Sequence, residues 1–198
     1  SFLYELLPFR TVALQYVWSR ALQLADVADQ GLRSRDIFDR GTATLSGIFG
    51  RTTDYIRGGS GFLVRPFVEL AQPGLGSDIQ YIKTGAELST YRELSDRFGI
   101  FGRLFVGRLW PQGASRAQDN PRIENRFDQV RFYAGGAADL RGWATQIAGP
   151  KRVRADISGS DTTFVYEAVG GLAKYATTFE LRMPFPGLGP EWGTAVFL

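Results

Sequence analysis

Apolar and polar residues alternate along most of this chain, and turn-forming residues separate the alternating runs. The alternation predicts β-strands, because successive side chains of a strand point to opposite faces. In the run Leu172–Phe185, one face carries Tyr175 and Phe179, and the other carries Glu180 and Arg182. The predicted strands are Thr11–Arg20, Thr42–Asp54, Gly61–Ala71, Gln80–Arg92, Arg97–Trp110, Leu172–Phe185 and Gly193–Leu198.

The length of these runs favours strands that cross a membrane. They hold 10 to 14 residues, except for the last, whereas strands of globular proteins have about 5–6. A strand that crosses a bilayer needs about 9–11 residues. No stretch has the roughly 20 continuous apolar residues of a transmembrane helix, so a helical membrane protein is excluded. A soluble β-sandwich shows the same alternation and stays open as an alternative.

The connections between the predicted strands alternate in length. Ala21–Gly41 is long, Gln72–Ile79 is intermediate and Pro111–Gly171 is very long, and between them come the short connections Tyr55–Ser60, Glu93–Asp96 and Pro186–Trp192. Outer-membrane barrels have long extracellular loops and short periplasmic turns. The pattern therefore predicts an all-β fold, a transmembrane antiparallel β-barrel that is represented here by a partial barrel of about seven strands with one very long extracellular loop.

Composition narrows the possible chemistry. The 198 residues have a net charge of +3 and include neither Cys nor His. Thiolate and imidazole metal sites and a Ser-His-Asp triad are therefore excluded. The basic residues are spread along the chain, carboxylate pairs such as Asp36 and Asp39 have no diagnostic spacing, and no glycine-rich phosphate loop precedes a helix. We expect no enzyme, no metal, no cofactor and no nucleic-acid partner.

The longest connection, Pro111–Gly171, contains a glycine-rich motif, and a connection of this length is usually functional. Adjacent glycines permit a tight reversal, and the glycine after Arg141 lets the backbone pack closely. The chain can thus present Arg141 at the tip of a compact hairpin, although a surface turn with a solvated arginine is the alternative. The motif consists of Phe132-Tyr133-Ala134-Gly135-Gly136 followed by Leu140-Arg141-Gly142-Trp143.

This motif resembles the BamA/TamA superfamily of outer-membrane insertases and transporters, also called the bacterial surface antigen family. In that family the sixth extracellular loop carries Phe-Tyr-x-Gly-Gly and an Arg-Gly-aromatic tip, and it folds back into the barrel lumen. The resemblance implies that Arg141 meets Glu180, an acidic residue within a strand that ends near Pro184. Such a charge-assisted pair would hold the loop inside the pore. A merely hydrated Glu180 in the lumen is the alternative.

The resemblance also implies a domain organisation and a function. Residues 1–198 would form a segment of a single outer-membrane β-barrel domain, without POTRA repeats or the first and last barrel strands. The implied protein is an assembly factor that folds and inserts β-barrel proteins into the outer membrane of a Gram-negative bacterium. Its implied partners are client β-barrel proteins, outer-membrane lipids, and accessory lipoproteins or periplasmic subunits. A two-partner secretion pore similar to FhaC, of the same superfamily, is the alternative function, and a soluble β-sandwich binding module is a third.

Overall fold

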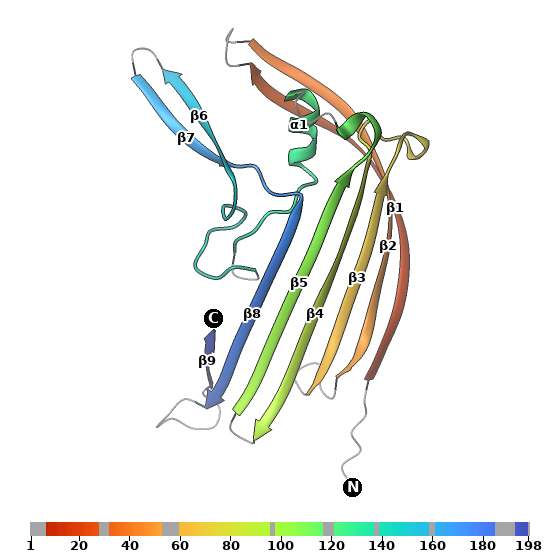
Figure 1. The fold of residues 1–198 in the computed structure, drawn as a ribbon, viewed down its shortest axis with the longest axis vertical. Coiled ribbons are helices and arrows are strands. Elements are labelled where there is room, and N and C mark those ends of the chain that lie inside the picture. The colour runs from red at the N-terminus through yellow and green to blue at the C-terminus, as the bar shows by residue number, and fades with distance from the viewer. Residues whose placement is uncertain are drawn as a thin grey trace.

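The computed structural model shows a wide antiparallel sheet that curves without closing (Figure 1). It describes residues 7–27, 32–52, 60–95, 98–116, 121–136, 139–158, 161–184 and 193–197. Seven strands form the sheet in the order β1-β2-β3-β4-β5-β8-β9, and β6 and β7 form a separate ribbon. The strands are β1 Leu7–Val27, β2 Leu32–Thr52, β3 Gly61–Ala71, β4 Tyr81–Ser95, β5 Phe98–Pro111, β6 Lys151–Ser158, β7 Asp161–Ala168, β8 Ala173–Pro184 and β9 Gly193–Phe197. The expectation of an all-β partial barrel with about seven strands is confirmed.

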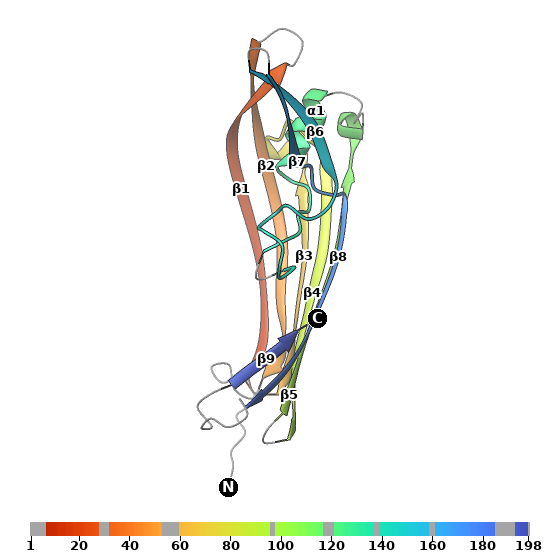
Figure 2. The same ribbon diagram turned by 90° about the vertical axis from the view of Figure 1, so that its left-hand side faces the viewer.

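Three short helices lie at one end of the sheet. They are the 3-10 helices η1 Pro73–Leu75 and η2 Gly113–Arg116 and the α-helix α1 Pro121–Asp128. None of the helices in the described residues is long and apolar enough to span a membrane. The ribbon of β6 and β7 extends from the same end, which we call the loop end (Figure 2). Strands β2, β4 and β8 end, and strands β3, β5 and β9 begin, at the opposite end, which we call the turn end (Figure 1).

The two faces of the sheet differ in chemistry. On the outer face, Leu14 lies opposite Leu45, and Leu45 lies opposite Val68, and all three side chains are exposed. On the inner face, Glu87 forms two ion pairs: its Oε1 lies 2.7 Å from Arg65 Nη1, and its Oε2 lies 2.6 Å from Arg103 Nη2. A β-sandwich would cover its apolar face with a second sheet. No second sheet covers it in the described part of the chain, which is the arrangement of a barrel wall that faces lipid.

The hydrophobic core lies on the inner face at the loop end. It joins α1 to the wall, where the ring of Phe127 meets the ring of Tyr81 edge-on with 6.0 Å between centroids. Both side chains are fully buried, so the beginning of the long connection is packed against the barrel wall. The buried members of this core are Phe38, Ala71, Ile79, Tyr81, Leu109, Phe127 and Val130.

The prediction of a long loop over Ala21–Gly41 is wrong. Strand β1 continues to Val27 and β2 begins at Leu32, and the two strands stay paired along this stretch, from Ala21 opposite Phe38 to Val27 opposite Leu32. The hairpin therefore projects well past the neighbouring strands at the loop end (Figure 1). Seven charged residues interrupt the apolar alternation between Asp26 and Arg40, so the pattern missed this part of the hairpin.

The connection Pro111–Gly171 also contains more regular structure than its sequence suggested. Besides η2 and α1 it holds the β6–β7 hairpin, with Val153 opposite Tyr166. Val153, Ala155 and Ile157 do alternate with charged residues, but over too short a run to predict a strand without its partner. The predicted turns Tyr55–Ser60 and Pro186–Trp192 lie outside the described residues, except for Ser60.

Candidate functional site

The glycine-rich motif lies against the inner face of the wall. Phe132 and Gly171 form an isolated β-bridge, in which the N–H of each residue donates to the carbonyl of the other at 2.9 and 2.8 Å. The Phe132 ring meets the ring of Phe105, on β5, edge-on at 5.9 Å, and the ammonium of Lys83, on β4, lies 4.5 Å from its centroid. The start of the motif is thus held by backbone, aromatic and cation–π contacts.

Two glycines reverse the chain after this contact. Gly135 and Gly136 have φ values of 116° and 102°, which side chains other than glycine rarely tolerate. The N–H of Gly136 then donates to the carbonyl of Trp143 at 3.0 Å, and Ala148 N–H donates to the carbonyl of Ala134 at 3.0 Å. These bonds close the hairpin that the sequence predicted and place Arg141 near its tip.

Arg141 and Glu180 are in direct contact. The distance from Arg141 Nη2 to Glu180 Oε1 is 2.5 Å, and the side chain of Glu180 is only 3% exposed whereas that of Arg141 is 38% exposed. The other carboxylate oxygen, Oε2, accepts from Arg182 Nη2 at 3.0 Å and from Arg182 Nε at 3.2 Å. Glu180 is therefore not a merely hydrated charge, because two guanidinium groups hold it on opposite oxygens.

Arg182 was not among the expected site residues, although the alternation placed it on the same face as Glu180. Its guanidinium also lies over the rings of Tyr91 and Phe101, at 5.5 and 5.3 Å from their centroids. This second cation reduces the dependence of Glu180 on Arg141.

A second ionic contact joins the motif to the wall through Lys174, on β8. Its ammonium donates to Asp139 Oδ2 at 2.7 Å and to the carbonyl of Tyr133 at 2.9 Å. The same Asp139 oxygen accepts from the N–H of Gly135 at 3.0 Å, so it also holds the glycine turn. Sequence reasoning did not identify this pair. Lys174 lies on the same face of β8 as Glu180, and this shared face was the only feature of the sequence that pointed to a role for Lys174 in the site.

A third ionic contact holds α1. Arg126 donates from Nε to one carboxylate oxygen of Asp36 on β2 at 2.6 Å and from Nη2 to the other at 2.8 Å. Its guanidinium also lies 5.2 Å from the centroid of the Phe38 ring. The hydrogen bond with Asp36 raises the pKa of Arg126 above its ordinary value, which keeps the pair charged. Asp36 thus forms part of the anchor and, unlike Asp39 on the outer face, points inward.

Between the anchor at α1 and the motif lies a partly buried charged cluster. The hydroxyl of Tyr133 donates to the backbone carbonyl of Asp128 at 2.6 Å, and burial raises the pKa of Tyr133. Burial also raises the pKa of the Asp128 carboxyl, although Arg131 and Arg152 lie nearby and oppose the shift. Asp128 Oδ1 is buried and accepts no hydrogen bond from the described residues, although Arg131 Nη1 lies 3.5 Å from it. This oxygen is therefore held by an ion pair rather than by a hydrogen bond.

The tip of the motif makes fewer contacts than its base. Trp143 is exposed, and Gly142, with φ of 89°, has open space where a side chain would begin. Leu140 is half-buried. The structure therefore brings Phe132, Tyr133 and Arg141 to the wall, holds Gly135 within the hairpin through Asp139, and leaves the Trp143 side chain exposed.

The charges of this site mostly connect the loop to the wall. In the described ranges, no group of three or more His, Cys, Asp or Glu side chains is arranged to hold a metal ion. Each of Glu180, Asp139 and Asp36 instead faces a cation from another segment of the chain. This arrangement can hold a long loop in one position inside a barrel.

Comparisons with known proteins agree with the fold. Residues 21–198 match the family profile described as the Omp85 superfamily domain. Among solved structures, the crystal structure of BamA from Haemophilus ducreyi lacking POTRA domains 1-3 is similar, with a TM-score of 0.69 and 18% sequence identity. The alignment covers 94% of this chain and 37% of that chain. The similarity to BamA therefore concerns the fold, over little more than a third of the larger protein.

Proposed function

Because this chain belongs to the Omp85 superfamily, we propose that it forms part of an outer-membrane assembly factor that folds and inserts client β-barrel proteins. The superfamily and the barrel fold support a role either in the insertion of outer-membrane proteins or in protein secretion. Of these two roles we propose insertion. In this proposal the loop segment 132–148 braces the lumen. The observation that carries the proposal is the contact between Arg141, in the loop, and the buried Glu180 on the inner face of β8.

The loop needs anchors because ordering it carries a large cost in conformational free energy. Fixing the backbone of one residue costs about 1–2 kcal/mol, so a long irregular segment stays in place only with several anchors. This loop has the Phe132 contacts, the Lys174–Asp139 pair and the Arg141–Glu180 pair, all with inward side chains of the wall. A wall braced in this way can keep its shape while another part of the barrel changes.

Insertion of a client strand requires no cofactor. An open sheet edge presents unpaired backbone N–H and C=O groups, and an incoming strand can pair with them by β-augmentation. The free energy comes from the backbone hydrogen bonds and from the burial of apolar surface in lipid. The clients are therefore unfolded outer-membrane β-barrel proteins, and the partners would include accessory lipoproteins or periplasmic subunits that deliver them.

The experiment uses the full-length protein in proteoliposomes with an unfolded porin as the client. We expect Arg141→Ala and Glu180→Ala to slow the appearance of protease-resistant porin, while both variants keep a folded barrel. Arg20→Gln is the matched control, because Arg20 pairs with Asp39 on the outer face. Normal porin assembly by both lumen variants would contradict the proposal. If those variants instead reduced export of an unfolded secreted polypeptide, the chain would belong to a secretion pore similar to FhaC.

A further inference from the structure

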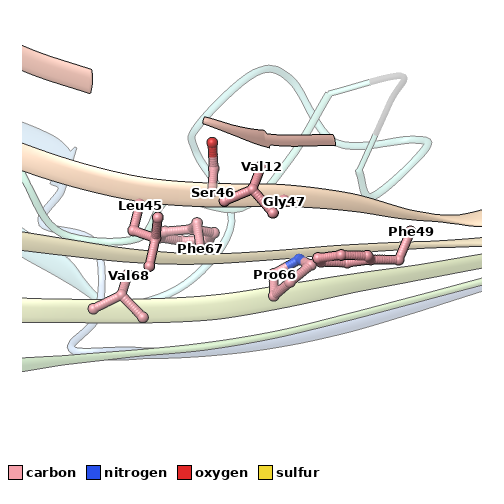
Figure 3. Close-up of a pocket in the computed structure, with 8 residues that line it drawn as sticks. All are labelled: Val12, Leu45, Ser46, Gly47, Phe49, Pro66, Phe67 and Val68. Carbon is pink, nitrogen blue, oxygen red and sulfur yellow. The ribbon is translucent and has the colours of Figure 1, made fainter. Parts of the chain in front are cut away.

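A hollow on the outer face crosses β1, β2 and β3 (Figure 3). It has a volume of about 210 Å³, and its exposed lining is entirely apolar. Val12 from β1 and Gly47 from β2 lie on one side of it, and Pro66 and Val68 from β3 lie on the other. The outer face of an outer-membrane barrel is in contact with lipid, so the hollow is continuous with a hydrocarbon environment.

The sequence explains why the wall is hollow here. The pairing of β2 with β3 runs to Ser46 opposite Phe67 and resumes only at Phe49 opposite Val64. Pro66 lies in this interval, and proline has no N–H to donate to a neighbouring strand. Gly47, which has no side chain to fill the space, lies beside it. The Phe49 ring packs over Gly47 and forms one wall of the hollow.

Two arginines lie on the same outer face, toward the turn end. Arg10 is directly opposite Phe49, which lines the hollow, and Arg51 is directly opposite Phe62. Because residue 8 lies opposite Arg51, the two arginines are diagonal neighbours, with roughly 7–8 Å expected between such positions. Both are exposed, and neither has an ion-pair partner among the residues that the structure describes.

A single phosphate group fits this pair of arginines. Guanidinium groups form charge-assisted and often bidentate hydrogen bonds with phosphate. The long connection from β5 to β8 leaves the wall at the loop end, and in outer-membrane barrels the long loops are extracellular, so the turn end faces the periplasm. In the outer membrane of Gram-negative bacteria, the periplasmic leaflet consists of glycerophospholipids. A phosphate at Arg10 and Arg51 would place an acyl chain of the same molecule beside Val12.

We propose that Arg10, Arg51 and the hollow between Val12, Gly47 and Pro66 bind one glycerophospholipid of the periplasmic leaflet. The two guanidinium groups hold its phosphate, and one acyl chain occupies the hollow. The site lies on the face opposite the Arg141 loop, and it needs only that the barrel reside in the outer membrane. It is therefore independent of the choice between insertion and secretion.

The test is a titration of the full-length protein with dioleoylphosphatidylglycerol, with bound lipids counted by native mass spectrometry. In the double variant Arg10→Gln, Arg51→Gln, the most tightly bound lipid should lose about ten- to a hundredfold in affinity. Gly47→Leu places a side chain against the Phe49 ring that forms one wall of the hollow, so it changes the shape of the hollow and should also weaken that lipid. The matched controls are Arg108→Gln, an exposed outward arginine beside Trp110, and Gly102→Leu, on the outer face of β5. Both controls should retain the affinity of the parent protein.

Three results would overturn the proposal. The first is unchanged affinity in the double arginine variant, which decides the question even if Gly47→Leu fails to fold. The second is an equal loss in Arg108→Gln, because the effect would then be one of general surface charge. The third is displacement of the bound lipid by lipopolysaccharide, or binding of dioleoylglycerol, which lacks the phosphate, as tight as that of dioleoylphosphatidylglycerol. We expect no displacement by lipopolysaccharide and much weaker binding of dioleoylglycerol.

Discussion

Glu180 is the most deeply buried charge of the loop site, and the two guanidinium groups around it differ in origin. Arg182 comes from the same strand two residues later, whereas Arg141 comes from the loop. A buried carboxylate is stable only when it is paired and hydrogen-bonded. Arg182 would still pair with Glu180 if the loop moved away, so the wall remains charge-balanced with or without the loop.

Loss of Glu180 should therefore affect the loop more than loss of Arg141. Arg141→Ala should reduce the stability of the docked loop by about 1–2 kcal/mol, since Arg141 is partly exposed and Glu180 keeps Arg182. Glu180→Ala removes the counterion of both arginines and leaves two like charges close together. Hydrogen exchange of amides 132–148 in the full-length protein measures the difference, and equal protection in both variants would contradict it.

A charge-reversed pair tests whether this contact acts directly. The double variant Arg141→Glu, Glu180→Arg should recover only part of the lost amide protection, because Arg182 would then lie beside a second cation. Adding Arg182→Gln should increase the recovery. No recovery in either combination would mean that the loop is held elsewhere.

The long connection is attached to the wall as a series of elements, each with its own anchor. Helix α1 uses Arg126 with Asp36 and the buried Phe127. The motif that follows uses Lys174 with Asp139, and the tip uses Arg141 with Glu180. The docked position of the long connection therefore depends on several contacts along its length.

The anchor at Lys174 should control the glycine turn. Lys174→Met keeps the aliphatic length but removes the donor to Asp139 and to the carbonyl of Tyr133. We expect a loss of about 1–3 kcal/mol in the stability of the docked motif, because charged hydrogen bonds with low exposure are broken. Proteolysis of the 132–148 segment should become faster, whereas Lys151→Met, on the exposed β6, should leave it unchanged.

The junction between α1 and the motif should respond to pH through Asp128. Burial raises the pKa of this carboxyl in the folded loop, so its protonated form is favoured there. Its stabilising effect is complete below the unfolded pKa of about 3.9 and is lost as the pH rises through the raised folded value. Amide protection of α1 should therefore fall over that range in the parent protein.

Asp128→Asn provides the comparison for this pH effect. The amide cannot ionise, so protection of α1 should vary less with pH over the same range and should exceed that of the parent at neutral pH. The groups that face Asp128 are Arg131, Arg152, Glu124 and Glu167, and all of them remain in this variant. An unchanged pH profile would assign the effect to another group.

The wall as a whole separates lipid from lumen by the direction of alternate side chains. A charge on the outer face should therefore be far more costly than one on the inner face. Leu45→Arg should reduce the stability of the full-length barrel in phospholipid vesicles by about 2–4 kcal/mol. Thr44→Arg, one position away, points inward opposite Glu69 and should cost much less. Denaturant titration of vesicle-inserted protein compares them, and equal losses would contradict the assignment of the faces.

The alternating pattern of the sequence was sufficient to predict the two faces of the sheet and most strands inside the membrane band. Alternation placed Glu180 on the polar face, and the resemblance of the glycine motif to the BamA/TamA superfamily identified it as the partner of Arg141. The projecting part of the β1–β2 hairpin could not be predicted, since residues beyond the membrane are not constrained to alternate. The β6–β7 hairpin was missed because its two short strands depend on each other.

Local periodicity thus decided the direction of each side chain, because a strand repeats every two residues regardless of what surrounds it. Apart from the Arg141–Glu180 pair, which the family resemblance implied, only the tertiary structure showed which charges meet. Arg126 pairs with Asp36 across 90 positions, and Lys174 pairs with Asp139 across 35. Such partners depend on how the loop folds onto the wall and on strand register. No short-range sequence pattern encodes contacts between residues so far apart in the chain, since these contacts result from the packing of the whole chain.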